Sequence, residues 1–385
     1  MFGYVTALAT VGIHTVLVCP TSKVSETVRT THVPTGAGLV LLPTGRVFSA
    51  LRGSALAGRL DGRRDPRTLM RAVATHTAPY AGTPLVGLAR ELRRVRARAV
   101  LCQEYETPRF DACVVVGRAL HRPVFGVFQG GDEQHSVLER PLRPLALRGA
   151  AGLLSGSAAE LERVRATYRI SEAKLSRVPN PVDVAFWRPG DRAAARAALG
   201  IDADARVVAW HGQLLVHRKG LDVLLAAWES VCADRTGREL VLVLVGGGED
   251  VEDVRRRIDA ARGVDVRLVD EWVHDRARIR DVLVAADLYA FPSRSEGVPV
   301  APAEAMACGL PVVGSRANGV PDVIGDCGSV VDRDDPAALA AAVGALLDDD
   351  DRRTALGLAA RARAEQHFSH AAVGTALRSI MLGGP

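Results

Sequence analysis

The chain has 385 residues, of which 48% are hydrophobic and only 4% are aromatic. This length predicts two domains, and so few aromatic rings offer no platform on which nucleic-acid bases could stack. We therefore expect no nucleic-acid partner. Residues 1–180 contain 25 basic and 13 acidic side chains, whereas residues 181–385 contain 24 basic and 31 acidic ones. A basic first half suits an anionic acceptor or a lipid headgroup surface.

Targeting signals and cysteine pairs are both lacking in the sequence. No window approaches the roughly 18 consecutive apolar residues of a membrane span, and the first twenty residues have no basic leader. We therefore expect a cytoplasmic protein, and the basic half leaves open a peripheral contact at the inner membrane face. The six cysteines are scattered without a C-x-x-C pair, which predicts reduced thiols and no zinc site.

The start of the chain predicts a helix at 2–13, which leads directly into a strand-like run at 14–20. A doubly wound domain normally opens with a strand and a turn, so the first strand of this domain is missing from the predicted order. If a native start lies upstream, we expect an extended chain to melt at a higher temperature and to turn over faster. The alternative is that the first twenty residues are not a helix followed by a second strand.

Apolar runs and helical patterns alternate along the rest of the chain. One helical pattern places Leu221, Leu224, Leu225 and Trp228 on one face. The segment Arg90–Ala99 is interpreted as the solvated face of an amphipathic helix. Buried strands are predicted at 98–104, 122–129, 151–156, 205–212, 240–248, 266–272, 287–293 and 310–315.

This alternation predicts an α/β protein with two doubly wound parallel sheets. The segment Arg177–Asp191 contains three prolines, which interrupt any helix or central strand. We therefore place the domains at 1–180 and 181–385.

Two glutamates, Glu296 and Glu304, follow the strand predicted at 287–293. Pro302 and Gly309 predict the start and end of a short helix, which puts Glu296 in the preceding loop and Glu304 in the first helical turn. Carboxylates accept hydrogen bonds from adjacent sugar hydroxyls, and a helix start favours diphosphate. Two glutamates at this spacing are also common by chance, and a glutamate in a first turn often serves only the helix dipole.

A second candidate patch follows the strand predicted at 205–212. Lys219 is one of three lysines in a chain with 46 arginines, and it stands beside Arg218 before a glycine. Since the chain otherwise uses arginine as its cation, a lysine at this position indicates that a compact ammonium group is needed, as for a phosphate contact. Gly246 and Gly247 follow the next strand and allow a ligand to approach the backbone closely, although such a run is more often only a turn.

Taken together, these segments resemble the retaining glycosyltransferases of family 4. The stretch 291–315, with its two glutamates, is similar to the E-x7-E motif of that family, while the segments 217–225 and 244–250 resemble its phosphate-binding lysine segment and glycine turn. The resemblance implies a GT-B fold, in which two Rossmann-like domains face a central cleft. It also leaves open that the last helix packs back on the first domain.

The activity implied is transfer of a sugar from a nucleoside diphosphate donor of UDP or GDP type to a glycolipid or small-molecule acceptor. The nucleotide sugar is a co-substrate, and no cofactor or metal is expected. By position, Glu304 would hold the ribose, Glu296 the sugar hydroxyls, and Lys219 the departing diphosphate. The donor oxygens would meet backbone N–H groups at Gly297, Val298 and Val300. The implied route is a front-face path that retains the anomeric configuration.

The chain also departs from the family pattern. Gly212 and Gln213 stand where the family usually has Gly-Arg, and Arg218 is the candidate replacement for that charge. Gln129, followed by Gly130, stands where the family often has His-Gly. The remaining acceptor-side candidates are His135, Glu104 and Tyr105.

These departures keep two rival hypotheses open. One is a non-catalytic partner subunit of GT-B fold that binds a sugar nucleotide. The other is a nicotinamide-dependent oxidoreductase, although the chain lacks a G-x-G-x-x-G run followed by an acidic residue.

Overall fold

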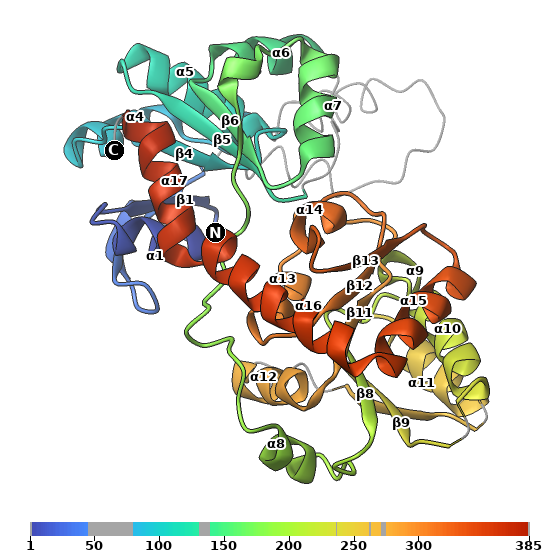
Figure 1. The fold of residues 1–385 in the computed structure, drawn as a ribbon. Coiled ribbons are helices and arrows are strands. Elements are labelled where there is room, and N and C mark those ends of the chain that lie inside the picture. Colours follow the sequence, from blue (N-terminus) through green and yellow to red (C-terminus); the bar gives the residue numbers. More distant parts are fainter. Residues whose placement is uncertain are drawn as a thin grey trace, which may run out of the picture. The chain divides into compact units, whose positions relative to one another are not determined.

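The computed structural model describes residues 2–44, 80–130, 139–235, 237–261, 263–270 and 275–383. The chain divides into two compact units (Figure 1). The N-terminal unit comprises Met1–Val178 together with Gly374–Pro385, and the C-terminal unit comprises Pro179–Val373. None of the helices in the described ranges is long and apolar enough to cross a membrane.

A parallel sheet in the order β10-β9-β8-β11-β12-β13 forms the centre of the C-terminal unit. The side chains of β9, β11 and β12 are buried throughout, because these strands are apolar on both faces. The strand order reverses between β8 and β11, which is where ligands of doubly wound proteins usually bind. The strands are β8 (Arg206–His211), β9 (Leu240–Val245), β10 (Asp265–Val269), β11 (Leu288–Phe291), β12 (Val312–Ser315) and β13 (Gly328–Val331).

Helices connect these strands, and α10 packs against α15 while α8 packs against α12 (Figure 1). The predicted apolar face of α10 is buried in the core. Aspartate side chains cap α8, α12, α15 and α16 by accepting first-turn N–H bonds. The elements are α8 (Arg192–Ala198), α9 (Val216–Lys219), α10 (Leu221–Ala233), α11 (Val251–Ala260), α12 (Arg276–Ala285), α13 (Ala301–Ala307), α14 (Val320–Ile324), α15 (Pro336–Asp348), α16 (Asp350–Arg363) and the π-helical η2 (Ala364–Phe368). The last helix, α17 (His370–Leu382), belongs to the N-terminal unit from Gly374 onward.

The described part of the N-terminal unit contains two sheets. In the first, β3 pairs in parallel with β1 and antiparallel with β2. In the second, four parallel strands follow the chain order β4-β5-β6-β7. The strands are β1 (Val16–Thr21), β2 (Val28–His32), β3 (Ala37–Pro43), β4 (Val100–Gln103), β5 (Val124–Phe128), β6 (Gly152–Ser155) and β7 (Leu175–Arg177).

The helices of this unit build a second core with the strands. Near the end of the chain, α17 lies against α1, because a Cβ added to Gly374 would come within 2.1 Å of the Ala7 carbonyl oxygen (Figure 1). The elements are α1 (Phe2–Thr10), α4 (Leu85–Arg94), α5 (Pro108–Ala119), α6 (Glu139–Gly149), α7 (Ala158–Tyr168) and the 3₁₀ turn η1 (Glu172–Lys174).

Every strand predicted from an apolar run is present, but β2, β3, β7 and β13 were missed. Residues of β2 are almost all exposed, β7 has only three residues, and β13 is half-buried, so none of these three strands presents a continuous apolar run. The strand β3 does contain an apolar run, which was not recognised as a strand. The helical pattern at Arg90–Ala99 also ends early. The helix α4 stops at Arg94, and Arg96 adopts a positive φ of 50°.

Candidate active site

Two glycine-containing loops meet at the carboxyl ends of β8 and β9. A Cβ added to Gly246 would lie 1.8 Å from the Gly212 carbonyl oxygen, so no larger residue fits at this contact. The Leu214 N–H donates to the Gly247 carbonyl at 2.9 Å, which joins the two loops again. These glycines therefore serve close packing between loops within the C-terminal unit.

Lys219 and Glu296 form an ion pair at the switch point of the sheet. The distance from Lys219 Nζ to Glu296 Oε1 is 2.6 Å, although the two residues are 77 positions apart in the sequence. Their side chains are only 15% and 9% exposed. The Ser293 hydroxyl donates to the same carboxylate at 2.5 Å. The Glu296 carboxylate is thus fixed by two donors.

Backbone contacts hold the two loops of this ion pair together. A Cβ added to Gly220, which follows Lys219 with φ of 66°, would lie 2.1 Å from the Pro292 carbonyl oxygen. The Arg294 N–H donates to the Arg218 carbonyl at 2.9 Å. The Arg294 guanidinium also pairs with Asp222 in the first turn of α10 at 2.7 Å. Glycine at 220 is required, because the position needs both a positive φ and this close approach.

Glu304 lies in the first turn of α13 and contacts the end of β8. Its Oε2 atom is 3.0 Å from His211 Nε2, and its side chain is 19% exposed. His211 is fixed by Tyr289, whose hydroxyl donates to the His211 carbonyl at 3.1 Å. Burial raises the pKa of Tyr289 well above its ordinary value, so this hydroxyl keeps its proton. Glu304 is thereby oriented by a histidine that the tyrosine holds in place.

The sequence pattern missed three residues of this arrangement: His211, Ser293 and Tyr289. His211 and Ser293 lie at the carboxyl ends of predicted strands, which is the only signal that could have suggested them, whereas Tyr289 lies within β11. Nothing in the local sequence pairs them with Glu304 or Glu296, because these contacts span long separations.

The remaining donor-side candidates lie around the same loops. Gly297 packs closely against Gly319, because a Cβ added to Gly319 would lie 2.3 Å from the Gly297 carbonyl oxygen. Val298 is buried, and its carbonyl accepts a hydrogen bond from Asn180 at 2.8 Å. Val300 precedes α13 and is 36% exposed. Two further candidates, Gln213 and Arg218, have exposed side chains.

In the N-terminal unit, Gln129 is held at the end of β5. Its side-chain amide oxygen accepts from the Gln103 side chain at 2.6 Å, and its backbone N–H donates to the Glu104 carboxylate at 2.8 Å. Glu104 adopts a positive φ of 60° directly after β4, and Gly130 follows with φ of 103°. The structure therefore brings Gln129 and Glu104 together at one sheet edge.

The other two acceptor-side candidates are Tyr105 and His135. Tyr105 is fully buried, where its ring stacks on Phe128 and its hydroxyl donates to Glu160 at 2.6 Å. Because the Tyr105 ring is packed in the core, it has no exposed surface that an acceptor could contact. His135 lies outside the described residues.

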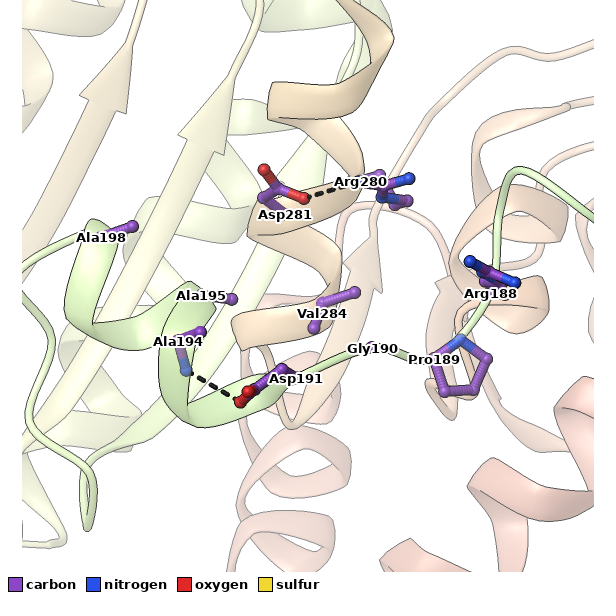
Figure 2. Close-up of a pocket in the computed structure, with 10 residues that line it drawn as sticks. All are labelled: Arg188, Pro189, Gly190, Asp191, Ala194, Ala195, Ala198, Arg280, Asp281 and Val284. Carbon is purple, nitrogen blue, oxygen red and sulfur yellow. Dashed lines mark hydrogen bonds and ion pairs between the residues drawn. The ribbon is translucent and has the colours of Figure 1, made fainter.

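Figure 2 shows a cavity elsewhere in the C-terminal unit, with a volume of about 470 Å³. It lies between α8, α12 and the segment 188–191, and it contains an ion pair of Arg280 with Asp281 at 3.2 Å. Asp191 caps α8 at its wall by accepting from the Ala194 N–H at 3.0 Å. No candidate site residue lines this cavity, so we assign it no part in the site.

The chemistry available at the switch point is therefore two oriented carboxylates and one ammonium group. The carboxylates can accept hydrogen bonds from hydroxyl groups, and the ammonium can neutralise an anion. Comparison with known proteins agrees with a site for a sugar substrate, since residues 205–349 match the family model Glycosyl transferases group 1.

Relatives and solved structures extend this match. The D-inositol 3-phosphate glycosyltransferase of Segniliparus rotundus is 36% identical over 224 residues, which cover 56% of this chain and 49% of that protein. Sucrose-phosphate synthase of Thermosynechococcus elongatus is 20% identical with a TM-score of 0.67, and the match covers 98% of this chain and 90% of that one. HepE of Anabaena, solved in complex with UDP, is 18% identical with a TM-score of 0.66, over 78% of this chain and 82% of that one.

The chain spans about half the length of the curated relatives it matches. The family match confirms the resemblance to glycosyltransferases, and the structural neighbours confirm the predicted fold class. The chain carries a Glycosyl transferases group 1 domain in its C-terminal unit and has the GT-B fold.

Proposed function

We propose that the chain is a retaining glycosyltransferase that moves a sugar from a UDP- or GDP-type donor to a phosphorylated, lipid-linked or other small acceptor without a metal. The observation that carries this proposal is the 2.6 Å contact between Lys219 and Glu296 at the switch point of the sheet. An ammonium and a fixed carboxylate there match the two ends of a nucleotide sugar, which are an anionic diphosphate and a ring of hydroxyls. The UDP bound to the HepE structure supports a nucleotide donor.

In this proposal Glu304 accepts hydrogen bonds from the ribose hydroxyls, while Glu296 accepts them from the sugar. The bond between the anomeric carbon and the diphosphate oxygen breaks, and the acceptor oxygen bonds to the same face of the sugar. The departing phosphate takes the proton of the acceptor hydroxyl. Lys219 stabilises the negative charge that develops on the leaving diphosphate, which is where a cation lowers the barrier most.

A thermal-shift screen with UDP, GDP and NAD⁺ tests the donor class first. Stabilisation by UDP or GDP, with none by NAD⁺, is the expected result, because ligands that bind the folded state raise its melting temperature. Stabilisation by NAD⁺ alone would favour an oxidoreductase. The non-catalytic rival, motivated by Gln129 and Gln213, requires a second measurement: hydrolysis or transfer of the sugar from either donor would eliminate it.

Replacing Glu304 by alanine should weaken binding of the free nucleotide by about 1 to 3 kcal/mol, roughly 5- to 150-fold in Kd, because a charge-assisted hydrogen bond is lost. Glu296→Ala should instead leave nucleotide affinity unchanged and reduce turnover, since its proposed partner is the sugar. Calorimetric titration with UDP and GDP measures the first effect. The exposed Glu229→Ala on α10 is the matched control. Unchanged nucleotide affinity in Glu304→Ala would show that Glu304 does not hold the ribose.

Activity should persist in excess EDTA, because Lys219 supplies the positive charge that magnesium supplies in other transferases. Turnover is compared before and after chelation, and after manganese or magnesium is added back. Complete loss on chelation with recovery on adding either metal would contradict the role given to Lys219.

A further inference from the structure

A cavity of about 450 Å³ in the N-terminal unit lies at the carboxyl ends of its strands. Its walls are the end of β1 with the following turn, Thr44 directly after β3, Gly82 and Thr83 before α4, and the start of α5, which follows β4. Ligands of α/β proteins bind at this edge of a sheet, and the volume is within the range of small-molecule sites. None of the site residues considered above lines this cavity.

Two cations line the cavity, and the described residues of its wall include no carboxylate. Lys23 and Arg109 are both exposed, and neither side chain forms an ion pair with a described residue. The acidic residue in the first turn of α5, Asp111, pairs with the buried Arg143 at 2.8 Å and accepts from Tyr80 at 3.0 Å. Its charge is therefore already compensated, and the cavity keeps an excess of positive charge.

Thr44 provides an independent sign of a ligand. Its side chain is buried, with 6% of the residue exposed, and its hydroxyl has no hydrogen-bond partner among the described residues. The backbone holds it in place, because the Thr44 N–H donates to the Thr21 carbonyl at 3.1 Å. A buried hydroxyl without a partner is costly, so a hydroxyl on the wall of a cavity implies a partner supplied from within the cavity.

The start of α5 adds a third favourable feature. This helix has 12 residues, and Thr107 before it does not cap the helix with its side chain. The Thr107 hydroxyl instead donates to the Glu104 carbonyl at 2.9 Å. The positive end of the helix dipole, with Thr107, Pro108 and Arg109 all on the cavity wall, is thus left without a side-chain cap, and the first-turn Asp111 is already paired with Arg143.

We propose that this cavity binds the phosphate of a phosphomonoester of a sugar or small polyol. A phosphomonoester carries a charge of about −1.5 to −2 at neutral pH and three acceptor oxygens. It therefore matches two cations and a wall that includes the hydroxyl side chains of Thr21, Thr44 and Thr83, whereas a carboxylate offers one charge and two oxygens. That the phosphate belongs to the acceptor rests on the proposed function; the anion site itself does not.

Calorimetric titration with glucose 6-phosphate and inorganic phosphate, with glucose as the uncharged reference, tests the site. Lys23→Gln and Arg109→Gln should each raise the Kd of both phosphates about tenfold or more, because each removes a charge-assisted contact. Thr44→Val should raise it about three- to tenfold without lowering the melting temperature of the ligand-free protein, since the hydroxyl has no partner to lose. The exposed Arg98→Gln, which removes the same charge outside the cavity, should change neither.

Sedimentation with phosphatidic acid vesicles, against phosphatidylcholine vesicles, separates a lipid source of the phosphate from a soluble one. Binding of either phosphomonoester that weakens in the three cavity variants supports the proposal and identifies the source. Absence of binding to both, or binding that none of the three variants weakens, overturns it. UDP binding is measured on the same samples, so a protein that binds UDP but no phosphomonoester would contradict this site alone.

Discussion

Replacing Lys219 by alanine is expected to lower turnover about 10²- to 10³-fold, the effect of removing one group that stabilises charge in a transition state. Lys219 Nζ lies 2.6 Å from Glu296, so the variant also removes the partner of a largely buried carboxylate. Turnover and melting temperature must therefore be measured together. Lys219→Arg keeps the charge but not the compact ammonium, and it should retain part of the activity.

A double variant separates catalysis from stability. Combining Lys219→Ala with Glu296→Gln removes the unpaired charge, which should recover stability without recovering turnover, because the two effects have different causes. The exposed Arg352→Ala on α16 is the matched control for loss of a cation. If Lys219→Ala keeps most of its turnover, the diphosphate is neutralised by another group.

Replacing Asp287 by alanine is expected to destabilise the C-terminal unit by about 3 to 5 kcal/mol, the usual cost of removing one partner from a buried ion network. Its carboxylate is fully buried, accepts from the Val207 N–H at 2.7 Å and contacts Arg196 at 2.9 Å. Arg192 and Arg353 also pair with it. Burial lowers the pKa of Arg196, and the neighbouring Arg192 lowers it further. Without Asp287 these arginines would repel one another.

Tryptophan fluorescence during urea unfolding measures this effect selectively. All four tryptophans fall between positions 187 and 272, so the signal reports the C-terminal unit. Asp259→Ala, an exposed aspartate on α11, should change the free energy of unfolding by no more than about 0.5 kcal/mol. Asp287 precedes β11, at the sheet edge opposite the glutamates, so nucleotide affinity of the folded variant should be unchanged. A free energy of unfolding close to that of the unaltered protein would show that the arginines find other partners.

The sequence by itself determined the elements whose pattern is local. The strands β8, β9, β11 and β12 were predicted because continuous apolar runs report burial on both faces, and α10 because its apolar side chains recur with the helical period. Pro302 located the start of α13 within one residue, which placed Glu304 in its first turn correctly. The motif spacing around Glu296 and Lys219 then suggested the resemblance to glycosyltransferases, since that information is carried by residue types alone, and the family match of residues 205–349 confirms this resemblance.

Only the tertiary structure decided which side chains meet. Glu304 contacts His211 across 93 positions, and Glu296 contacts Lys219 across 77, because parallel pairing brings the carboxyl ends of distant strands to one edge. The same pairing buried Tyr105, which looked like a surface loop residue from its neighbours. It also gathered Lys23, Thr44 and Arg109 around one cavity. No local periodicity records such contacts, since register and strand order are fixed by the packing of the whole sheet.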